Sequence, residues 1–189
     1  VSETPSPSRA TAAAEQDLPD CVDGEALWPL APGAGRCEVV CFTSNPDAAF
    51  ATLSVDRVRT VVDVWADRTA ELSALPGVRQ VFCFENRGKE IGVTLTHPHG
   101  QIYAYPYLPP RTDALIRRSR EHFESTGRLL LADVLDAETR SGRRVVLACE
   151  HWTAYVPAAS RWPLEVHLAP HRHVRDLAEL TDGARDVLP

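Results

Sequence analysis

The chain has 189 residues, of which 20 are basic and 26 acidic, and its formal net charge at pH 7 is -6. This length is enough for one domain with a sizeable buried core, or for one domain and the beginning of another. The negative charge argues against the basic surface that nucleic-acid binding usually requires. Any phosphate ligand would therefore have to be held by local contacts.

The cysteines and the apolar runs predict a soluble, cytoplasmic protein. Five cysteines stand at irregular spacing, which favours a reducing compartment. The longest apolar runs are far below the roughly 20 residues that span a bilayer, and no leader-like segment opens the sequence, so we expect neither a membrane segment nor export. The sequence has no methionine, so Val1 is either a non-standard start or a point inside a longer reading frame.

The first elements follow from local patterns. Residues 1–32 are rich in Ser, Pro, Ala and acidic residues without a sustained period, which predicts a flexible N-terminal segment. An apolar, β-branched run predicts a strand over residues 37–43. Ser54 then provides an N-cap, and apolar residues recur at spacings of three and four as far as Leu72, which predicts an amphipathic helix. A second strand is predicted over residues 78–84.

The later elements are predicted in the same way. A strand over residues 102–105 carries alternating tyrosines, which favour packing on the strand over a stacking platform for bases, and it ends before Pro109-Pro110. An arginine-rich stretch over residues 112–131 predicts a surface helix. Strands are then expected over residues 144–149, 152–156 and 164–168.

Two segments of the chain repeat each other. Glu38-Val-Val-Cys-Phe-Thr precedes Leu53 by 53 - 38 = 15 positions, and Glu165-Val-His-Leu-Ala-Pro precedes Leu180 by 180 - 165 = 15 positions. Equal spacing indicates a duplicated architecture. We therefore predict a first half over residues 33–149, nearly complete, and the start of a second half over residues 150–189.

The segment Thr96-His-Pro-His-Gly-Gln101 concentrates the chemistry. A neutral imidazole is a good nucleophile toward phosphorus when its second nitrogen carries a proton that has an acceptor. The carbonyl group of His97 is close enough in sequence to accept that proton from His99. Pro98 fixes the approach of the chain, and Gly100, which has no Cβ, is expected to let a phosphate come close to the backbone.

Gln101 decides the expected outcome of the reaction. It projects to the same side of a strand as His99, and its amide can donate to a phosphoryl oxygen without being a proton source. A third histidine at this position could protonate a leaving group and favour hydrolysis. Glutamine favours transfer.

These residues resemble the galactose-1-phosphate uridylyltransferase family of the histidine-triad superfamily. The resemblance runs from about Arg36 to the C-terminus and includes Phe84-Glu-Asn-Arg-Gly88, Gly92-Val-Thr94, His97-Pro-His-Gly-Gln-Ile-Tyr103, Glu150-His-Trp-Thr-Ala-Tyr-Val-Pro157, Arg161-Trp-Pro-Leu-Glu165 and Ala169-Pro-His-Arg-His173. It implies an α+β fold, a histidine-triad-like antiparallel sheet with packed helices, whose first half is nearly complete and whose second half is truncated.

The resemblance also implies a reaction and its residues. His99 would attack the α-phosphorus of UDP-glucose and then pass the uridylyl group to galactose 1-phosphate. His97 would orient His99 through its carbonyl, Asn86, Gly92 and Thr94 would contact the uridine or its phosphates, and Gln101 would contact the transferred phosphoryl group. The resemblance also implies a homodimer, so we expect either self-association or a complementing polypeptide.

Metal sites of the family are only partly matched. In members with a structural zinc the first histidine of the motif, here His97, is a ligand, but the other ligands are absent from this sequence and the loop over residues 25–30 has no histidine. His97 is therefore a candidate zinc ligand without the partners that the family's zinc site requires. Leu115 stands where some members have an iron-binding glutamate, so we predict no iron. The histidines over residues 165–173 match a structural strand and turn.

Two other functions remain open. A dinucleoside polyphosphate phosphorylase or related nucleotidylyltransferase shares the His-x-His-x-Gln logic but uses phosphate as the acceptor. Alternatively, the chain is a split-gene or truncated product that binds a nucleotide without turnover or works only with a partner.

Overall fold

The computed structural model describes residues 19–88, 95 and 97–188. Residues 1–33 and 34–189 are two compact units. The described part of the first unit contains a short 3-10 turn, η1 (Val22–Gly24), and Cys21 pairs with Pro29 in an isolated β-bridge. Residues 1–18 lie outside the described residues, so the flexibility expected for residues 1–32 stays a prediction.

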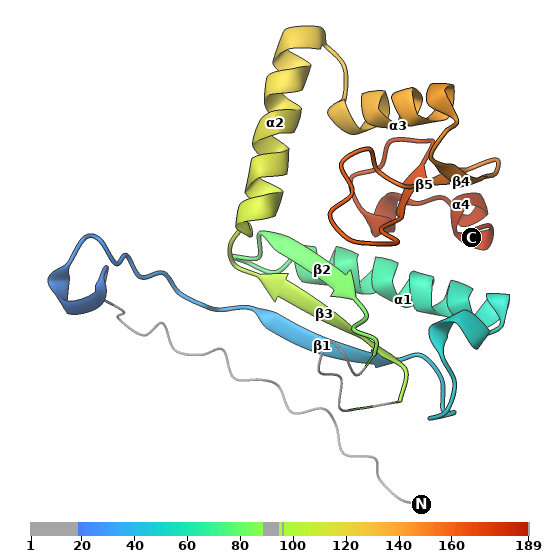
Figure 1. The fold of residues 1–189 in the computed structure, drawn as a ribbon. Helices are drawn as coiled ribbons and strands as arrows, with labels where there is room; N and C mark the ends of the chain where they lie inside the picture. The colour runs from blue at the N-terminus through green and yellow to red at the C-terminus, as the bar shows by residue number, and fades with distance from the viewer. Residues whose placement is uncertain (1–18, 89–94, 96, 189) are drawn as a thin grey trace, which may run out of the picture. The chain divides into compact units, whose positions relative to one another are not determined.

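The second unit begins with an antiparallel sheet of three strands, β1 (Arg36–Cys41), β2 (Gln80–Phe84) and β3 (His99–Tyr105), in the order β1-β3-β2 (Figure 1). The predicted start of the third strand at residue 102 is wrong by three residues. His99 pairs with Cys41, and Gln101 pairs with Val39 on one side and Phe84 on the other. Gly100 itself pairs with Val40 of β1, and this pairing carries the strand across a residue type that weakens a strand by itself.

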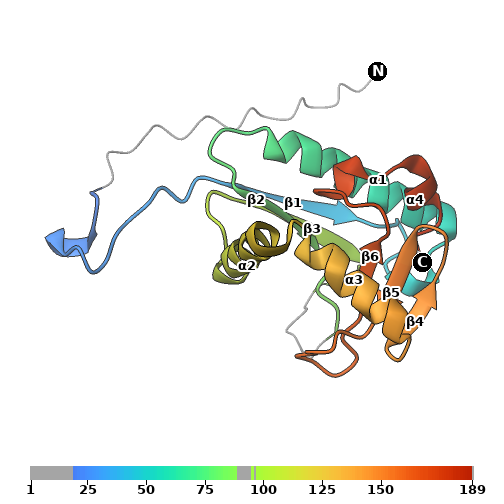
Figure 2. The same cartoon turned by 90° about the horizontal axis from the view of Figure 1, so that it is seen from above.

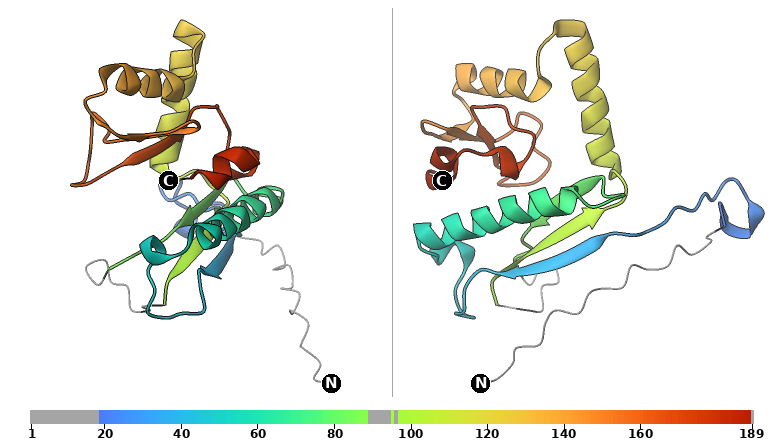
Figure 3. Two further views of the ribbon diagram at one scale, coloured as in Figure 1. Left: turned by 90° about the vertical axis from the view of Figure 1, so that its right-hand side faces the viewer. Right: turned by 180° about the vertical axis from the view of Figure 1, so that it is seen from behind.

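The helix α1 (Val55–Ser73) covers one face of this sheet (Figures 2 and 3). Its predicted N-cap is confirmed, because the Ser54 hydroxyl accepts the N–H of Arg57 at 3.3 Å. Leu72 packs against Ile102 and Ala104 in a buried core. Buried and half-buried residues alternate along β3, so His99, Gln101, Tyr103 and Tyr105 lie on the face opposite α1.

That opposite face carries a ladder of aromatic rings. The ring centroids of Phe82 and Phe84 are 5.2 Å apart, and those of Phe84 and Tyr103 are 5.0 Å apart. The ladder continues through Tyr105, 5.8 Å from Tyr103, to Tyr107 at 5.4 Å. The tyrosines therefore pack along the strand, as their alternation predicts.

Two helices follow the first sheet, where the sequence patterns predict one. The helix predicted over residues 112–131 corresponds to α2 (Pro110–Thr126), which ends five residues earlier, and a separate helix, α3 (Leu130–Ser141), follows it. Gly127 ends α2 in the left-handed conformation with φ of 69°. No pattern signalled α3, whose position depends on packing against α2 and β5.

The second sheet consists of β4 (Val145–Ala148), β5 (Trp152–Tyr155) and β6 (His167–Pro170) in the order β4-β5-β6. The predicted strand over residues 164–168 is wrong at its start. Leu164 has φ of 64°, and the Glu165 carboxylate accepts the backbone N–H groups of Arg161 and Trp162. This turn delays the strand to His167, because a non-glycine residue at positive φ cannot continue an extended strand.

The repeat inferred from the sequence has a structural counterpart. The 3-10 turn η2 (Phe50–Thr52) leads through Leu53 to the capped start of α1, and η4 (Leu177–Glu179) leads through Leu180 to α4 (Asp182–Asp186). Thr181 caps α4 as Ser54 caps α1, since its side chain accepts the N–H of Ala184 at 3.2 Å. This likeness supports duplication, whereas the domain boundaries themselves stay predictions.

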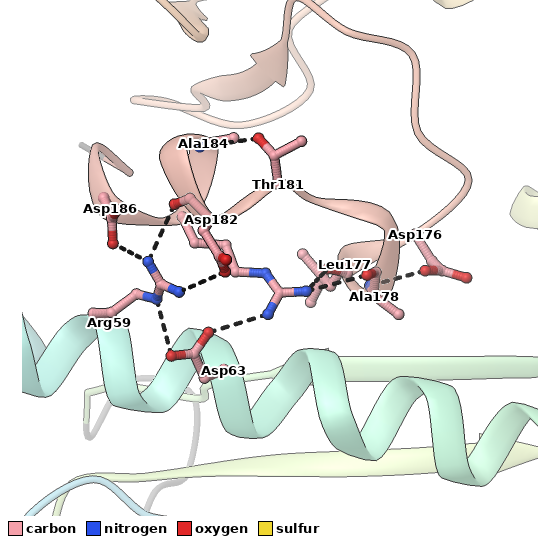
Figure 4. A network of polar contacts seen from close by, with 10 residues as sticks. Arg59, Asp63, Asp176, Leu177, Ala178, Thr181, Asp182, Ala184 and Asp186 are labelled. Atoms are coloured by element: carbon pink, nitrogen blue, oxygen red, sulfur yellow. Dashed lines mark hydrogen bonds and ion pairs between the residues drawn. The ribbon is translucent and has the colours of Figure 1, made fainter.

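Ion pairs join α4 to α1 (Figure 4). Arg59 donates to Asp63 at 2.9 Å and to Asp182 at 3.1 Å, and it also contacts Asp186. Arg185 donates to the other oxygen of Asp63 at 3.2 Å. The first and last helices of this unit are therefore held together by shared carboxylates. Among the residues that the structure describes, no helix is long and apolar enough to cross a membrane.

Candidate active site

The end of β1 holds the histidine segment through two hydrogen bonds. The backbone N–H of Phe42 donates to the carbonyl oxygen of Pro98 at 3.0 Å. The Nε2 atom of His97 lies 2.6 Å from the carbonyl oxygen of Thr43. A carbonyl oxygen only accepts, so Nε2 of His97 carries the proton and donates it. These contacts fix the chain on both sides of Pro98.

His99 has its ring fixed by the backbone of the same segment. Its Nδ1 atom lies 2.7 Å from the carbonyl oxygen of His97, which requires Nδ1 to be the protonated nitrogen. The lone pair is then on Nε2, which makes no hydrogen bond within the described residues. The arrangement predicted from the motif is therefore present, and it leaves a nucleophilic nitrogen available.

His99 lines a cavity of about 170 Å³. The cavity is formed where the end of β2 and the following turn face the histidine segment and the loop before α1. Its lining consists of Ala48, Ala49, Glu85, Asn86, Arg87, Gly88, Leu95, His97, Pro98 and His99. Gly88 has φ of 104°, a backbone conformation that favours glycine, and this allows the chain to turn at the cavity wall.

The cavity contains one carboxyl group and one guanidinium that the motif analysis did not assign. Burial raises the pKa of Glu85, while the charges of Arg87 and His99 oppose that rise. Arg87 is exposed and supplies a cation in the lining of the cavity that can attract a phosphate. Asn86 lies between these two residues in the sequence and lines the same cavity, as its predicted role requires.

Gln101 lies on the same sheet face as His99 but does not line this cavity. Its Oε1 atom accepts the hydroxyl of Tyr103 at 3.0 Å. Its NH₂ group is therefore the end of the amide that remains able to donate. The side of the strand on which Gln101 was expected is confirmed by the alternation of β3.

Position 100 requires glycine for a reason other than the predicted approach of a phosphate. A Cβ atom added to it would lie 2.8 Å from Cζ of Phe42 and 3.0 Å from Cζ2 of Trp65. Both rings are on the α1 side of the sheet, away from the face of His99. Glycine at this position therefore allows close packing of these two rings against the strand. The missing Cβ would point toward the rings, so its absence makes no room for a phosphate on the face of His99.

The structure brings His97, His99 and Asn86 together and places Gln101 beside them. Gly92 and Thr94, the other predicted binding residues, lie outside the described residues. Sequence reasoning missed Thr43, which acts through a carbonyl that any residue has, and the hydroxyl of Tyr103. Arg87 could have been predicted as a site residue, because it stands inside the segment Phe84-Glu-Asn-Arg-Gly88.

The surroundings of His97 do not fit a zinc ligand. Its Nε2 is engaged with Thr43, and within residues 19–88, 95 and 97–188 no three His, Cys, Asp or Glu side chains gather closely enough to hold a metal ion. Leu115, at the position of the family's iron-binding glutamate, is an apolar residue of α2.

Comparison with protein families gives two matches. Residues 5–109 match the model described as galactose-1-phosphate uridyl transferase, N-terminal domain. Residues 116–188 match the model for the C-terminal domain of the same family. The first match covers more than half of the chain and includes the segments that carry His99 and its neighbours.

Individual relatives agree with the family models. The chain is 58% identical over 160 residues to galactose-1-phosphate uridylyltransferase of Streptomyces lividans, covering 85% of this chain and 45% of that protein. It is 42% identical over 147 residues to the enzyme of the same name from Thermotoga maritima, covering 78% of this chain and 46% of the relative.

A solved structure described as uridylyltransferase superposes with a TM-score of 0.80 at 34% identity, covering 86% of this chain and 52% of the other. The α+β fold with antiparallel sheets and packed helices is thereby confirmed. The chain spans about half the length of the relatives that it matches. It belongs to the galactose-1-phosphate uridyl transferase family.

Proposed function

We propose that this chain carries the nucleophile for transfer of a uridylyl group from UDP-glucose to galactose 1-phosphate. The observation that carries the proposal is the hydrogen bond from Nδ1 of His99 to the carbonyl oxygen of His97 at 2.7 Å. This bond leaves the lone pair of Nε2 available for attack and stabilises the cationic ring that forms when Nε2 becomes bonded to phosphorus.

The proposed reaction has two steps with balanced bonds. Nε2 of His99 forms a bond to the α-phosphorus of UDP-glucose, while the bond from that phosphorus to the bridging oxygen breaks and its electron pair leaves with glucose 1-phosphate. A phosphate oxygen of galactose 1-phosphate then attacks the same phosphorus and releases Nε2. Arg87, which lines the cavity with His99, supports the proposal because its charge offsets the phosphate charge.

The test is covalent labelling of the purified chain with UDP-glucose radiolabelled at its α-phosphate. We expect an acid-labile, base-stable label that is absent from His99→Ala and retained in His173→Ala, where an exposed histidine outside the cavity is replaced. Addition of galactose 1-phosphate should discharge the label. A wild-type chain that takes up no label, either alone or mixed with the segments of the Streptomyces lividans relative that it does not match, contradicts the proposal.

The same assay separates the alternative functions. Labelling from an adenine nucleotide in preference to UDP-glucose, followed by discharge with inorganic phosphate, would favour a phosphorylase-like activity. Labelling without turnover until a second polypeptide is added would favour a partner-dependent chain.

We also propose that the active form is an assembly in a reducing, cytoplasmic compartment, either a homodimer or a complex with a complementing polypeptide. An open groove of about 920 Å³ between β2, α3 and β6 supports the binding of additional polypeptide. The five cysteines are free, which agrees with a reducing compartment. Sedimentation of the chain, alone and mixed with the segments of the Streptomyces lividans relative that it does not match, tests the assembly. A monomer in both samples contradicts it.

A further inference from the structure

Tyr103 and Gln101 form a contact on the face of β3 that carries His99. The two residues are two positions apart on one strand, so their side chains lie side by side. The hydroxyl of Tyr103 donates to Oε1 of Gln101 at 3.0 Å. Since an amide has one accepting and one donating end, a donor placed on Oε1 selects which end faces away from the tyrosine.

The ring of Tyr103 is itself held in place. It meets the ring of Phe84 edge to face at a centroid distance of 5.0 Å, and that of Tyr105 at 5.8 Å, with interplanar angles of 84° and 87°. Phe84 is also the residue directly opposite Gln101 across the β2–β3 pairing. The aromatic ladder therefore fixes the tyrosine oxygen relative to Gln101.

From this arrangement we infer that Tyr103 is a positioning residue for the proposed uridylyl transfer. Its hydroxyl holds the amide of Gln101 with the NH₂ group directed to the phosphoryl group on His99. The inference rests on the proposed function for its catalytic consequence, whereas the contact between the two side chains stands by itself. Tyr103 has no role in bond making, because it acts only through Gln101.

The physical reason is the charge of the transferred group. The phosphoryl oxygens are anionic, so an NH₂ group pointing at them stabilises them and a carbonyl oxygen would repel them. Without the tyrosine hydroxyl the amide can rotate between both orientations. A fixed amide avoids the fraction of molecules in which Oε1 faces the phosphoryl group.

The first experiment measures single-turnover labelling of His99 by UDP-glucose in Tyr103→Phe. This change removes the hydroxyl and keeps the ring in the ladder, and thermal unfolding checks that the fold is kept. Loss of one hydrogen bond predicts a labelling rate about 3- to 10-fold lower at saturation, with the half-saturating UDP-glucose concentration changed less than about twofold. Tyr105→Phe is the matched control, two residues along on the same face, and should label at the wild-type rate.

The second experiment observes the amide without any turnover. The chain contains three glutamines, Gln16, Gln80 and Gln101, so labelling of glutamine side chains with ¹⁵N gives a simple NMR spectrum. The Gln101 pair is assigned by its absence in Gln101→Leu. We expect these resonances to shift in Tyr103→Phe and to stay in place in Tyr105→Phe.

The outcomes separate the inference from the proposed function. A wild-type chain that takes up no label, either alone or mixed with the unmatched segments of the Streptomyces lividans relative, rejects the proposed function and its positioning step, while the amide resonances still report whether the contact exists. With a labelled wild type, the inference is overturned if Tyr103→Phe leaves either the rate or the Gln101 resonances unchanged. It is also overturned if Tyr105→Phe lowers the rate as much, because general ladder packing would then be the cause.

Discussion

The imidazole of His97 connects the segment that carries His99 to the residues that follow β1, since its Nε2 atom lies 2.6 Å from the carbonyl oxygen of Thr43. The backbone carbonyl of His97 in turn accepts the Nδ1–H of His99. His97 is therefore held in place through its side chain, and its backbone orients the ring of His99. These two hydrogen bonds explain a histidine at position 97 without metal binding.

His97→Ala should lower the free energy of unfolding by about 1–3 kcal/mol, because the part-buried carbonyl oxygen of Thr43 loses its hydrogen-bond donor. His97→Gln should recover most of this loss, since a glutamine amide can reach the position of Nε2 and donate to Thr43. Urea denaturation measures both changes. Stoichiometric zinc in the wild-type protein by mass spectrometry, lost in both variants, would contradict this account.

Gly100→Ala should destabilise the protein by about 1–3 kcal/mol, because overpacking forces side chains or backbone to shift. The added Cβ would meet Phe42 at 2.8 Å and Trp65 at 3.0 Å. Gly33→Ala is the matched control, since a Cβ there has no neighbour within 4 Å. Phe42→Leu in the Gly100→Ala background should return part of the stability. No recovery in the double variant would argue against the steric cause.

The ion pair between Glu38 and Arg68 predicts a dependence of stability on pH. The hydrogen bond from Arg68 holds the pKa of Glu38 below its ordinary value of 4.5, at distances of 2.8 and 3.0 Å to the two carboxylate oxygens. A lowered pKa in the folded state means that the stabilisation is present above the unfolded pKa and is lost as the pH falls through the folded value.

The free energy of unfolding should therefore fall as the pH drops below about 4.5, and it should fall less steeply in Glu38→Gln. Urea titrations at a series of pH values measure the slope. Glu124→Gln, which changes an exposed carboxyl group on α2, should keep the wild-type slope. Equal slopes in wild type and Glu38→Gln would show that this pair does not contribute.

The side chain of Trp152 connects the second sheet to α4. Its indole N–H donates to the carbonyl oxygen of Ala184 at 2.7 Å, and the side chain is only 4% exposed. Trp152→Phe should cost about 1–3 kcal/mol, since it leaves that acceptor without its donor. Trp162→Phe, at a position that is 72% exposed, should change stability by less than about 0.5 kcal/mol. Similar losses in both variants would contradict the structural difference.

Much of the fold could be predicted from local patterns. The helix after Ser54 and the three strands of the first sheet follow from apolar periodicity and capping, which are properties of neighbouring residues. The division between α2 and α3 could not, because a glycine inside a helical pattern is often tolerated. The start of β6 depended on the turn at Glu165, where a carboxylate accepts two backbone N–H groups.

The sequence by itself predicted that the carbonyl of His97 holds the ring of His99 and on which side of the strand Gln101 lies. These relations are short-range, so residue types and spacing suffice to specify them. The tertiary structure decided that Thr43 supports His97, that Arg87 and Glu85 share the cavity of His99, and that Gly100 serves the packing of Phe42 and Trp65. Those relations join segments distant in sequence, and only cross-strand register and helix packing bring their atoms together.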